Sequence, residues 1–113
     1  MKIYKILTTQ QWHSAQQTGV FRGAPVDLHD GYIHFSTAEQ VIETAHKHFK
    51  GQDGLLLAVV DDAMLGGALR YEPSRGGKLF PHLFGSLQLT VVERITPLPM
   101  GADGLHVFEG LLQ

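Results

Sequence analysis

The sequence contains no cysteine, which excludes disulfide bonds, thiolate catalysis and zinc sites built on cysteine ligands. It also lacks any apolar run approaching the roughly 20 residues of a membrane span. Lysines interrupt the first seven residues, a pattern that is not typical of a signal peptide. These absences predict a cytoplasmic protein without a membrane partner.

An excess of positive charge is missing as well. Nine Lys and Arg residues stand against 11 Asp and Glu, giving a formal net charge of -2. Proteins that bind the phosphate backbone of nucleic acids need a basic surface, so we do not expect nucleic acid as a partner. A few local arginines can still bind one small anion. The length of 113 residues, with 43% hydrophobic and 18% charged residues, predicts one domain over residues 1–113 and leaves its oligomeric state open.

Strand patterns outnumber helical patterns along the chain. The predicted strands cover 2–7, 32–36, 55–60, 69–72 and 86–93, with a last short strand within 105–112. The run 55–60 is apolar throughout and predicts a central strand buried on both faces. Because the strands do not alternate regularly with helices, we predict an α+β fold with a split, largely antiparallel β-sheet.

Two main helices are predicted. The first begins at Thr8 or Thr9 and ends near Gly19, and the second covers 38–49 with Thr37 and Gln40 as a capping box. The stretches 19–30, 61–67 and 73–78 are predicted as loops or turns. Proline at position 81 makes 80–85 an edge or a turn rather than a central strand.

The segment around His34 is the first candidate site. Strand side chains alternate between faces, so Tyr32, His34 and Ser36 share one face. They lead into the start of a predicted helix, where the helix dipole favours a phosphate. The structural alternative is a histidine that bonds a neighbouring strand, with Ser36 in place of Thr37 as the helix cap.

Four further residues are candidates. His82 follows a proline in an aromatic segment whose stiffness would aim its ring, or it packs there for structural reasons. Arg70 and Glu72 lie two residues apart on a predicted strand, where they could bind an anion and a ribose; an ion pair with each other is the reading that the sequence favours. Arg75 lies in a glycine-containing loop from which it could reach an anion or remain solvated.

Seven histidines raise the question of a metal. His46 and His48 would point in different directions from a helix, and the cluster Asp27, His29 and Asp30 lacks the spacing of a known site. We therefore expect no metal. A zinc hydrolase using His34, His82 and a loop carboxylate is kept as the weaker alternative.

Two motifs, Asp30-Gly31-Tyr32-Ile33-His34-Phe35-Ser36-Thr37 and Phe80-Pro81-His82-Leu83-Phe84-Gly85, together with Gln40 and Ala45, resemble a bacterial family known as domain of unknown function 952. The resemblance runs from the first strand to Pro97. It implies an ADP-ribosyltransferase-like fold, and Ile33-His34-Phe35-Ser36 is also similar to a motif of RNA 2′-phosphotransferases, which use NAD. The first strand departs from that pattern, since it offers only Tyr4 and Lys5 where related folds carry arginine or histidine, and the late-strand acid is Glu72 or Glu93.

The resemblance implies a transferase that binds NAD or ADP-ribose, a small nucleotide-like ligand. The residues it implies are His34, His82 and Glu72 for catalysis, and Tyr32, Ser36, Thr37, Arg70 and Arg75 for ligand binding. A non-catalytic protein that binds a small ligand in the same cleft is the main alternative.

Overall fold

The computed structural model describes residues 1–112. Its strands are β1 (Lys2–Thr8), β2 (Val20–Phe21), β3 (Ile33–His34), β4 (Ser36–Thr37), β5 (Leu55–Asp61), β6 (Leu69–Pro73), β7 (Leu79–Leu83), β8 (Leu87–Gln88) and β9 (Val92–Leu98). The α-helices are α1 (Thr9–Thr18), α2 (Pro25–Asp30) and α3 (Val41–His48). Short 3-10 turns occur at η1 (Asp62–Met64), η2 (Gly66–Ala68), η3 (Arg75–Gly77) and η4 (Leu89–Val91).

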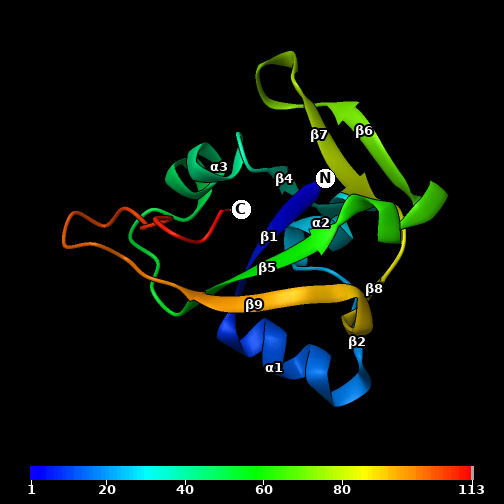
Figure 1. The fold of residues 1–113 in the computed structure, drawn as a ribbon, viewed down its shortest axis with the longest axis horizontal. Coiled ribbons are helices and arrows are strands. Elements are labelled where there is room, and N and C mark those ends of the chain that lie inside the picture. Colours follow the sequence, from blue (N-terminus) through cyan, green and yellow to red (C-terminus); the bar gives the residue numbers. More distant parts are fainter. Residues whose placement is uncertain (113) are drawn as a thin grey trace.

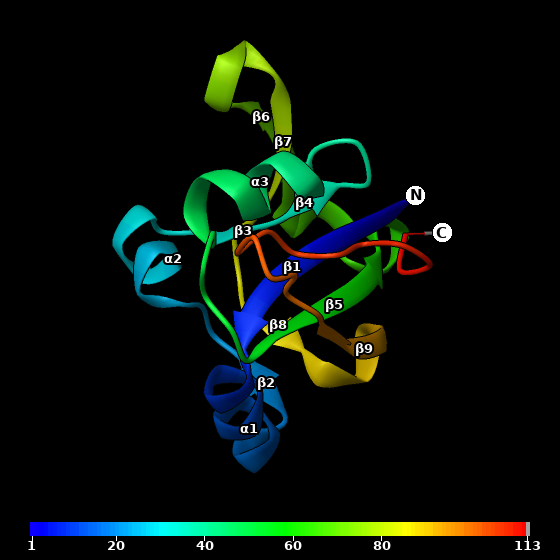
Figure 2. The same cartoon turned by 90° about the vertical axis from the view of Figure 1, so that its left-hand side faces the viewer.

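The strands form three antiparallel sheets. Their orders are β4-β1-β5-β9, β3-β7-β6 and β2-β8. In Figure 1 the β6–β7 hairpin projects beyond the long strands β1, β5 and β9, and Figure 2 shows it at the opposite end of the molecule from α1. The predicted α+β class with antiparallel pairing is confirmed, with three α-helices where the sequence predicted two. No helix within residues 1–112 has the length and apolar character needed to cross a membrane.

The four-stranded sheet has an apolar core on each face, as predicted from the β5 sequence. Leu57 and Val59 pack on one face with residues of α3, while Ala58 and Val60 pack on the other with residues of α1 and the three-stranded sheet. Because side chains alternate along a strand, burial of all four shows that β5 is covered on both sides.

The first helix begins and ends where the sequence predicts. The Thr8 hydroxyl accepts a hydrogen bond from the Gln11 backbone nitrogen at 2.9 Å. The Gln11 side-chain oxygen accepts one from the Thr8 backbone nitrogen at 2.9 Å, which completes a capping box. Gly19 ends the helix in the left-handed region, with φ of 78°. Both signals lie within a few residues of the helix.

The predicted strand 32–36 is wrong as a single strand, because the chain divides at Phe35 into β3 and β4, which belong to different sheets. The Phe35 nitrogen donates to the Pro81 carbonyl at 3.0 Å. Pro81 has no N–H to donate in return, so the ladder between β3 and β7 ends there. The next residues then pair with β1, with Ser36 opposite Tyr4.

Pro81 also corrects the prediction of an edge or turn at 80–85. β7 is the middle strand of its sheet, between β3 and β6. A proline is tolerated at this central position because its missing N–H falls where β3 has ended.

Thr37 does not cap a helix, which corrects a second prediction. Thr37 lies in β4, where it pairs with Ile3 of β1. The helix predicted over 38–49 begins only at Val41. The Gln40 side chain accepts from the Thr37 nitrogen at 3.0 Å, so these two residues close a turn before α3 rather than a capping box on it.

Three other stretches differ from prediction. The predicted loop 19–30 contains β2 and α2, whose first residue is Pro25, a position that suits proline. The predicted strand 86–93 is interrupted by η4, and β9 continues through Pro97 because it is an edge strand. The predicted strand within 105–112 is only an isolated bridge between Met100 and His106.

Candidate functional site

A cleft of about 540 Å³ lies where the chain passes from the three-stranded to the four-stranded sheet. Three consecutive residues at this crossing, His34, Phe35 and Ser36, all line it. β4 pairs only with the first part of β1, so the later part of β1, including Lys5 and Thr8, borders the cleft as well.

Half of the predicted site residues line this cleft. They are His34, His82, Ser36 and Arg75. The other four, Tyr32, Thr37, Arg70 and Glu72, do not line it. Tyr32 and Glu72 nevertheless contact His82 directly, through a ring contact and a hydrogen bond.

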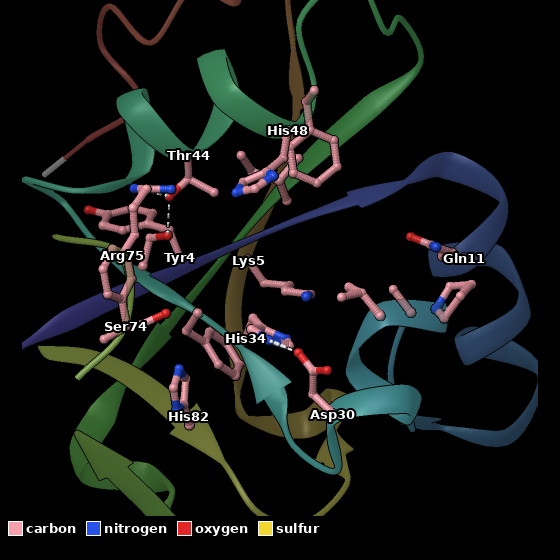
Figure 3. A pocket seen from close by; sticks show the side chains of 18 of the residues that line it. Tyr4, Lys5, Gln11, Asp30, His34, Thr44, His48, Ser74, Arg75 and His82 are labelled. Carbon is pink, nitrogen blue, oxygen red and sulfur yellow. Dashed lines mark hydrogen bonds and ion pairs between the residues drawn. The ribbon is translucent and has the colours of Figure 1, made fainter. Parts of the chain in front are cut away.

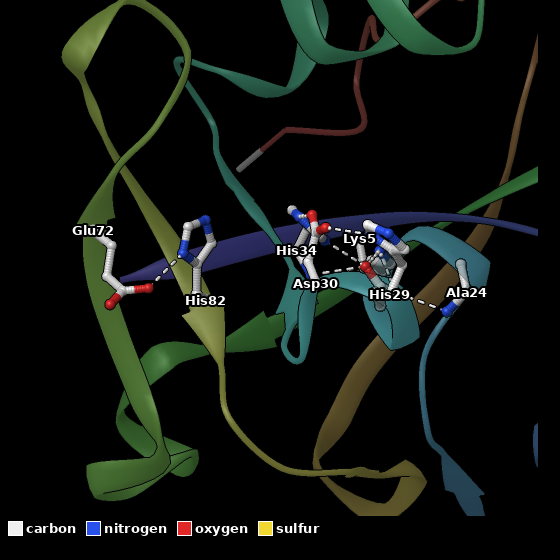
Figure 4. Close-up of polar contacts among 8 residues, drawn as sticks. Lys5, Ala24, His29, Asp30, His34, Glu72 and His82 are labelled. Atoms are coloured by element: carbon white, nitrogen blue, oxygen red, sulfur yellow. Dashed lines mark hydrogen bonds and ion pairs between the residues drawn. The ribbon is translucent and has the colours of Figure 1, made fainter.

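Both ring nitrogens of His34 face carboxylates. Nδ1 lies 2.6 Å from Asp27 Oδ1, and Nε2 lies 2.9 Å from Asp30 Oδ2. Figure 4 shows His34 beside Asp30, close to Lys5, His29 and Ala24. A carboxylate accepts hydrogen bonds only, and each ring nitrogen of His34 lies within hydrogen-bond distance of one. Two acids therefore fix the orientation of the His34 ring.

Asp27 is the centre of this network and was not predicted as a site residue. Its side chain is 1% exposed and lies 2.9 Å from the buried Lys5 ammonium. It also accepts from the Ala24 nitrogen at 2.7 Å and the His34 nitrogen at 3.1 Å. A proline at the first helical turn, followed two residues later by an acid, was the available sequence signal for a helix start there. Asp27 thereby ties α2 to β1 and β3.

The charges of this pair are set by burial and by their partners. Burial acts to raise the pKa of Asp27, but the bond from His34, the Lys5 charge and the Ala24 N–H outweigh it and lower the pKa to about 2. Burial lowers the pKa of Lys5 against the attraction of Asp27. Asp27 is thus a stable anion that can accept several hydrogen bonds at once.

His82 is held differently. Its Nδ1 donates to Glu72 Oε1 at 2.8 Å, and its ring stacks on Tyr32 with centroids 4.0 Å apart. The side chain is 3% exposed, and no group within residues 1–112 bonds its Nε2. The His34 ring lies edge-on, with a centroid distance of 5.6 Å. His82 lines the cleft, and its Nε2 is available for a further hydrogen bond.

Arg70 and Glu72 do not pair with each other, so the predicted ion pair is wrong. Glu72 bonds His82, while the Arg70 guanidinium lies 5.1 Å from the centre of the Phe84 ring. Arg70 stands opposite His82 in the strand register, on the same sheet face as Glu72. The shared face was predicted correctly, but Glu72 bonds His82 on β7 instead of Arg70.

Arg75 joins the β6–β7 hairpin to α3 across the cleft. Its Nε donates to Glu43 Oε1 at 3.0 Å, and its Nη2 donates to the Thr44 hydroxyl at 3.2 Å. The guanidinium also lies 5.0 Å from the centre of the Phe80 ring. Sequence reasoning missed Glu43 and Thr44, because both partners come from α3, more than thirty residues away from Arg75.

The described side chains can be searched for groups that could hold a metal ion. Within residues 1–112, no group of three or more His, Asp or Glu side chains is placed to hold a metal ion. His34, which the hydrolase alternative requires, has both nitrogens bonded to carboxylates.

Comparison with known proteins places the chain in one family. Residues 6–95 match the family described as protein of unknown function (DUF952). The crystal structure of protein CC0527 from Caulobacter crescentus is 45% identical, with a TM-score of 0.94 over 96% of each chain. The solution NMR structure of CC0527 is also 45% identical, with a TM-score of 0.88 over 98% of this chain and 96% of that one. No curated protein matches. The chain therefore belongs to the DUF952 family, as its two motifs predict.

Proposed function

We propose that the cleft binds a nucleotide ligand of the NAD or ADP-ribose class and that the protein transfers a group from it. The observation that carries this proposal is His82, whose Nδ1 is held by Glu72 while its Nε2 has no partner within residues 1–112. A histidine oriented by a carboxylate, with its other nitrogen in a cleft, is the arrangement of a general base.

The dimensions and lining of the cleft support a ligand of this class. Its volume of about 540 Å³ is within the range of small-molecule sites, roughly 300 to 1,000 Å³. Phe35, Phe49 and Phe80 supply apolar walls for a flat ring, while Ser36 and Arg75 supply polar groups for sugar and phosphate oxygens. The proposal includes an ADP-ribosyltransferase-like fold, which the family resemblance implies, and a cytoplasmic location, which the sequence predicts.

The proposed reaction requires only the ligand and an acceptor. With NAD, the bond between ribose C1′ and nicotinamide breaks, and nicotinamide leaves with the electron pair. The acceptor hydroxyl oxygen bonds to C1′ and its proton passes to His82 Nε2. Glu72 stabilises the resulting imidazolium through Nδ1.

His34 would have a binding role in this scheme. A ligand hydroxyl that reaches its Nε2 would replace Asp30, which is 33% exposed, rather than Asp27, which is 1% exposed and held by several donors. Asp27 would continue to orient the ring from Nδ1. Ser36, the next residue but one on the chain, would then contact the same sugar or phosphate.

The test combines binding and turnover in the wild type and two variants. Thermal shift with NAD, ADP-ribose and AMP should show stabilisation, about 2.7 kcal/mol at a hundred times the dissociation constant. Nicotinamide release, followed by mass spectrometry with candidate acceptors, should fall about 10²- to 10⁴-fold in His82→Gln while binding persists. His46→Gln, an exposed histidine outside the cleft, is the control and should change neither.

Each outcome has a distinct meaning. Binding without turnover for any acceptor would favour the non-catalytic alternative. Absence of any shift at millimolar ligand would overturn the nucleotide proposal.

A further inference from the structure

One end of the cleft gathers three hydroxyl groups around a single guanidinium. Ser36, Thr44, Ser74 and Arg75 all line this end. In Figure 3, Arg75 and Ser74 lie at one end of the cleft and Gln11 at the other, with His34 between them. We refer to the four residues as the hydroxyl–arginine end. They come from β4, α3 and the β6–β7 hairpin, so only the fold brings them together.

Some hydrogen-bond donors at this end have no acceptor within residues 1–112. The Thr44 hydroxyl donates to the Gln40 carbonyl at 3.1 Å and contacts Ser36 Oγ at 2.9 Å. Arg75 uses one N–H on Glu43 and one on Thr44, and its remaining N–H groups have no partner within residues 1–112. A guanidinium with free N–H groups beside hydroxyls is suited to phosphate oxygens, which accept bonds from both.

Glu43, the acid that bonds Arg75, is largely exposed to solvent. Glu43 is 63% exposed, whereas the Arg75 side chain is 22% exposed. Exposed ion pairs contribute little because water screens them and two long side chains must be ordered. An anion entering from the cleft can therefore exchange with Glu43 at Arg75 without breaking a buried interaction.

We propose that the hydroxyl–arginine end is a phosphate subsite and that Glu43 competes for it in the free protein. This deepens the proposed function, on which it rests for the nucleotide as ligand. With the phosphate at Arg75, the sugar of the ligand lies toward His34 and His82, farther along the cleft. The preferred ligand is then a nucleotide carrying phosphate, not a nucleoside.

The proposal is tested by the contribution of phosphate to affinity, measured by titration calorimetry with AMP, adenosine and pyrophosphate. The wild type should bind AMP at least tenfold more tightly than adenosine. Arg75→Gln should remove this difference and leave adenosine affinity unchanged. Glu43→Gln should strengthen AMP and pyrophosphate binding several-fold without affecting adenosine. These two variants therefore change phosphate affinity in opposite directions.

Two controls separate binding from folding. Arg22→Gln removes an arginine that lines a different groove, beside α1, and should leave all three affinities unchanged. Arg75→Lys keeps the positive charge and should restore part of the phosphate contribution, while circular dichroism verifies that each variant is folded. Arg75 lies in a partly exposed turn, so its replacement should not unfold the chain.

The outcomes distinguish this proposal from the one on which it rests. Equal AMP and adenosine affinity in the wild type, or a difference that survives Arg75→Gln, would overturn the phosphate subsite even if nucleotides bind. Pyrophosphate binding that depends on Arg75, with no binding of adenosine, AMP or NAD, would retain the anion subsite and overturn the nucleotide function. Binding of none of these ligands would overturn both.

Discussion

Replacing Asp27 tests the network beneath the cleft most directly. The Asp27→Asn substitution keeps the size of the side chain and removes its charge. It leaves the Lys5 ammonium, whose side chain is 7% exposed, without an anion, and it weakens the contact with His34 Nδ1. Breaking one partner of a buried ion pair costs about 3 to 5 kcal/mol, because the remaining charge is uncompensated.

That magnitude is large for a chain of 113 residues, since the total stability of a domain is about 5 to 15 kcal/mol. The native pKa of Asp27 gives a second measure of the interaction. The pKa falls from 3.8 to about 2, which corresponds to roughly 2 kcal/mol of folding free energy, since one pKa unit is about 1.36 kcal/mol. We therefore expect Asp27→Asn to lose at least that amount.

The assay is urea unfolding followed by circular dichroism, with the double variant Lys5→Met/Asp27→Asn as the decisive comparison. Removing both charges should recover much of the stability lost in Asp27→Asn, because neither ion is then buried alone. A loss below 1 kcal/mol in the single variant would refute the reasoning. So would a double variant as unstable as the sum of the two single substitutions.

Three other outcomes are expected. The stability contributed by Asp27, whose pKa is lowered on folding, should be fully present above pH 3.8 and lost as the pH falls toward about 2, which acid unfolding with and without Asp27→Asn would detect. Thr8→Ala should cost about 1 kcal/mol in urea unfolding by removing the cap of α1; an unchanged midpoint would contradict this and show that the Gln11 bond alone holds the helix start. Glu72→Ala should shift His82 away from the Nδ1–H tautomer, which side-chain ¹⁵N NMR measures directly; an unchanged spectrum would contradict the contact.

Local signals account for the parts of the fold that the sequence predicted well. The cap at Thr8, the stop at Gly19 and the apolar run of β5 each depend on residues a few positions apart, and each structure follows them. The break at Phe35 depends instead on Pro81, a residue distant in the sequence whose missing N–H ends the ladder. No periodicity within 32–36 contains that information.

The same distinction holds for the site. His34 and His82 were singled out from two separate motifs, and the pairing of β3 with β7 sets them opposite each other. Asp27 was missed because no local pattern predicts its burial; its partner Lys5 is 22 residues away, on β1. Arg75 was considered for an anion, but its contacts with α3 required the hairpin to fold over the cleft.

The break at Phe35 and the cleft have a common structural cause. Because Pro81 cannot continue the β3–β7 ladder, the chain leaves one sheet after His34 and enters the other at Ser36. β4 is only two residues long, so among residues 1–112 the later part of β1 has no strand partner on that side. The cleft is lined by His34, by His82 and by residues of this part of β1, including Lys5 and Thr8. A proline that ends strand pairing therefore also opens the cleft that His34 and His82 line.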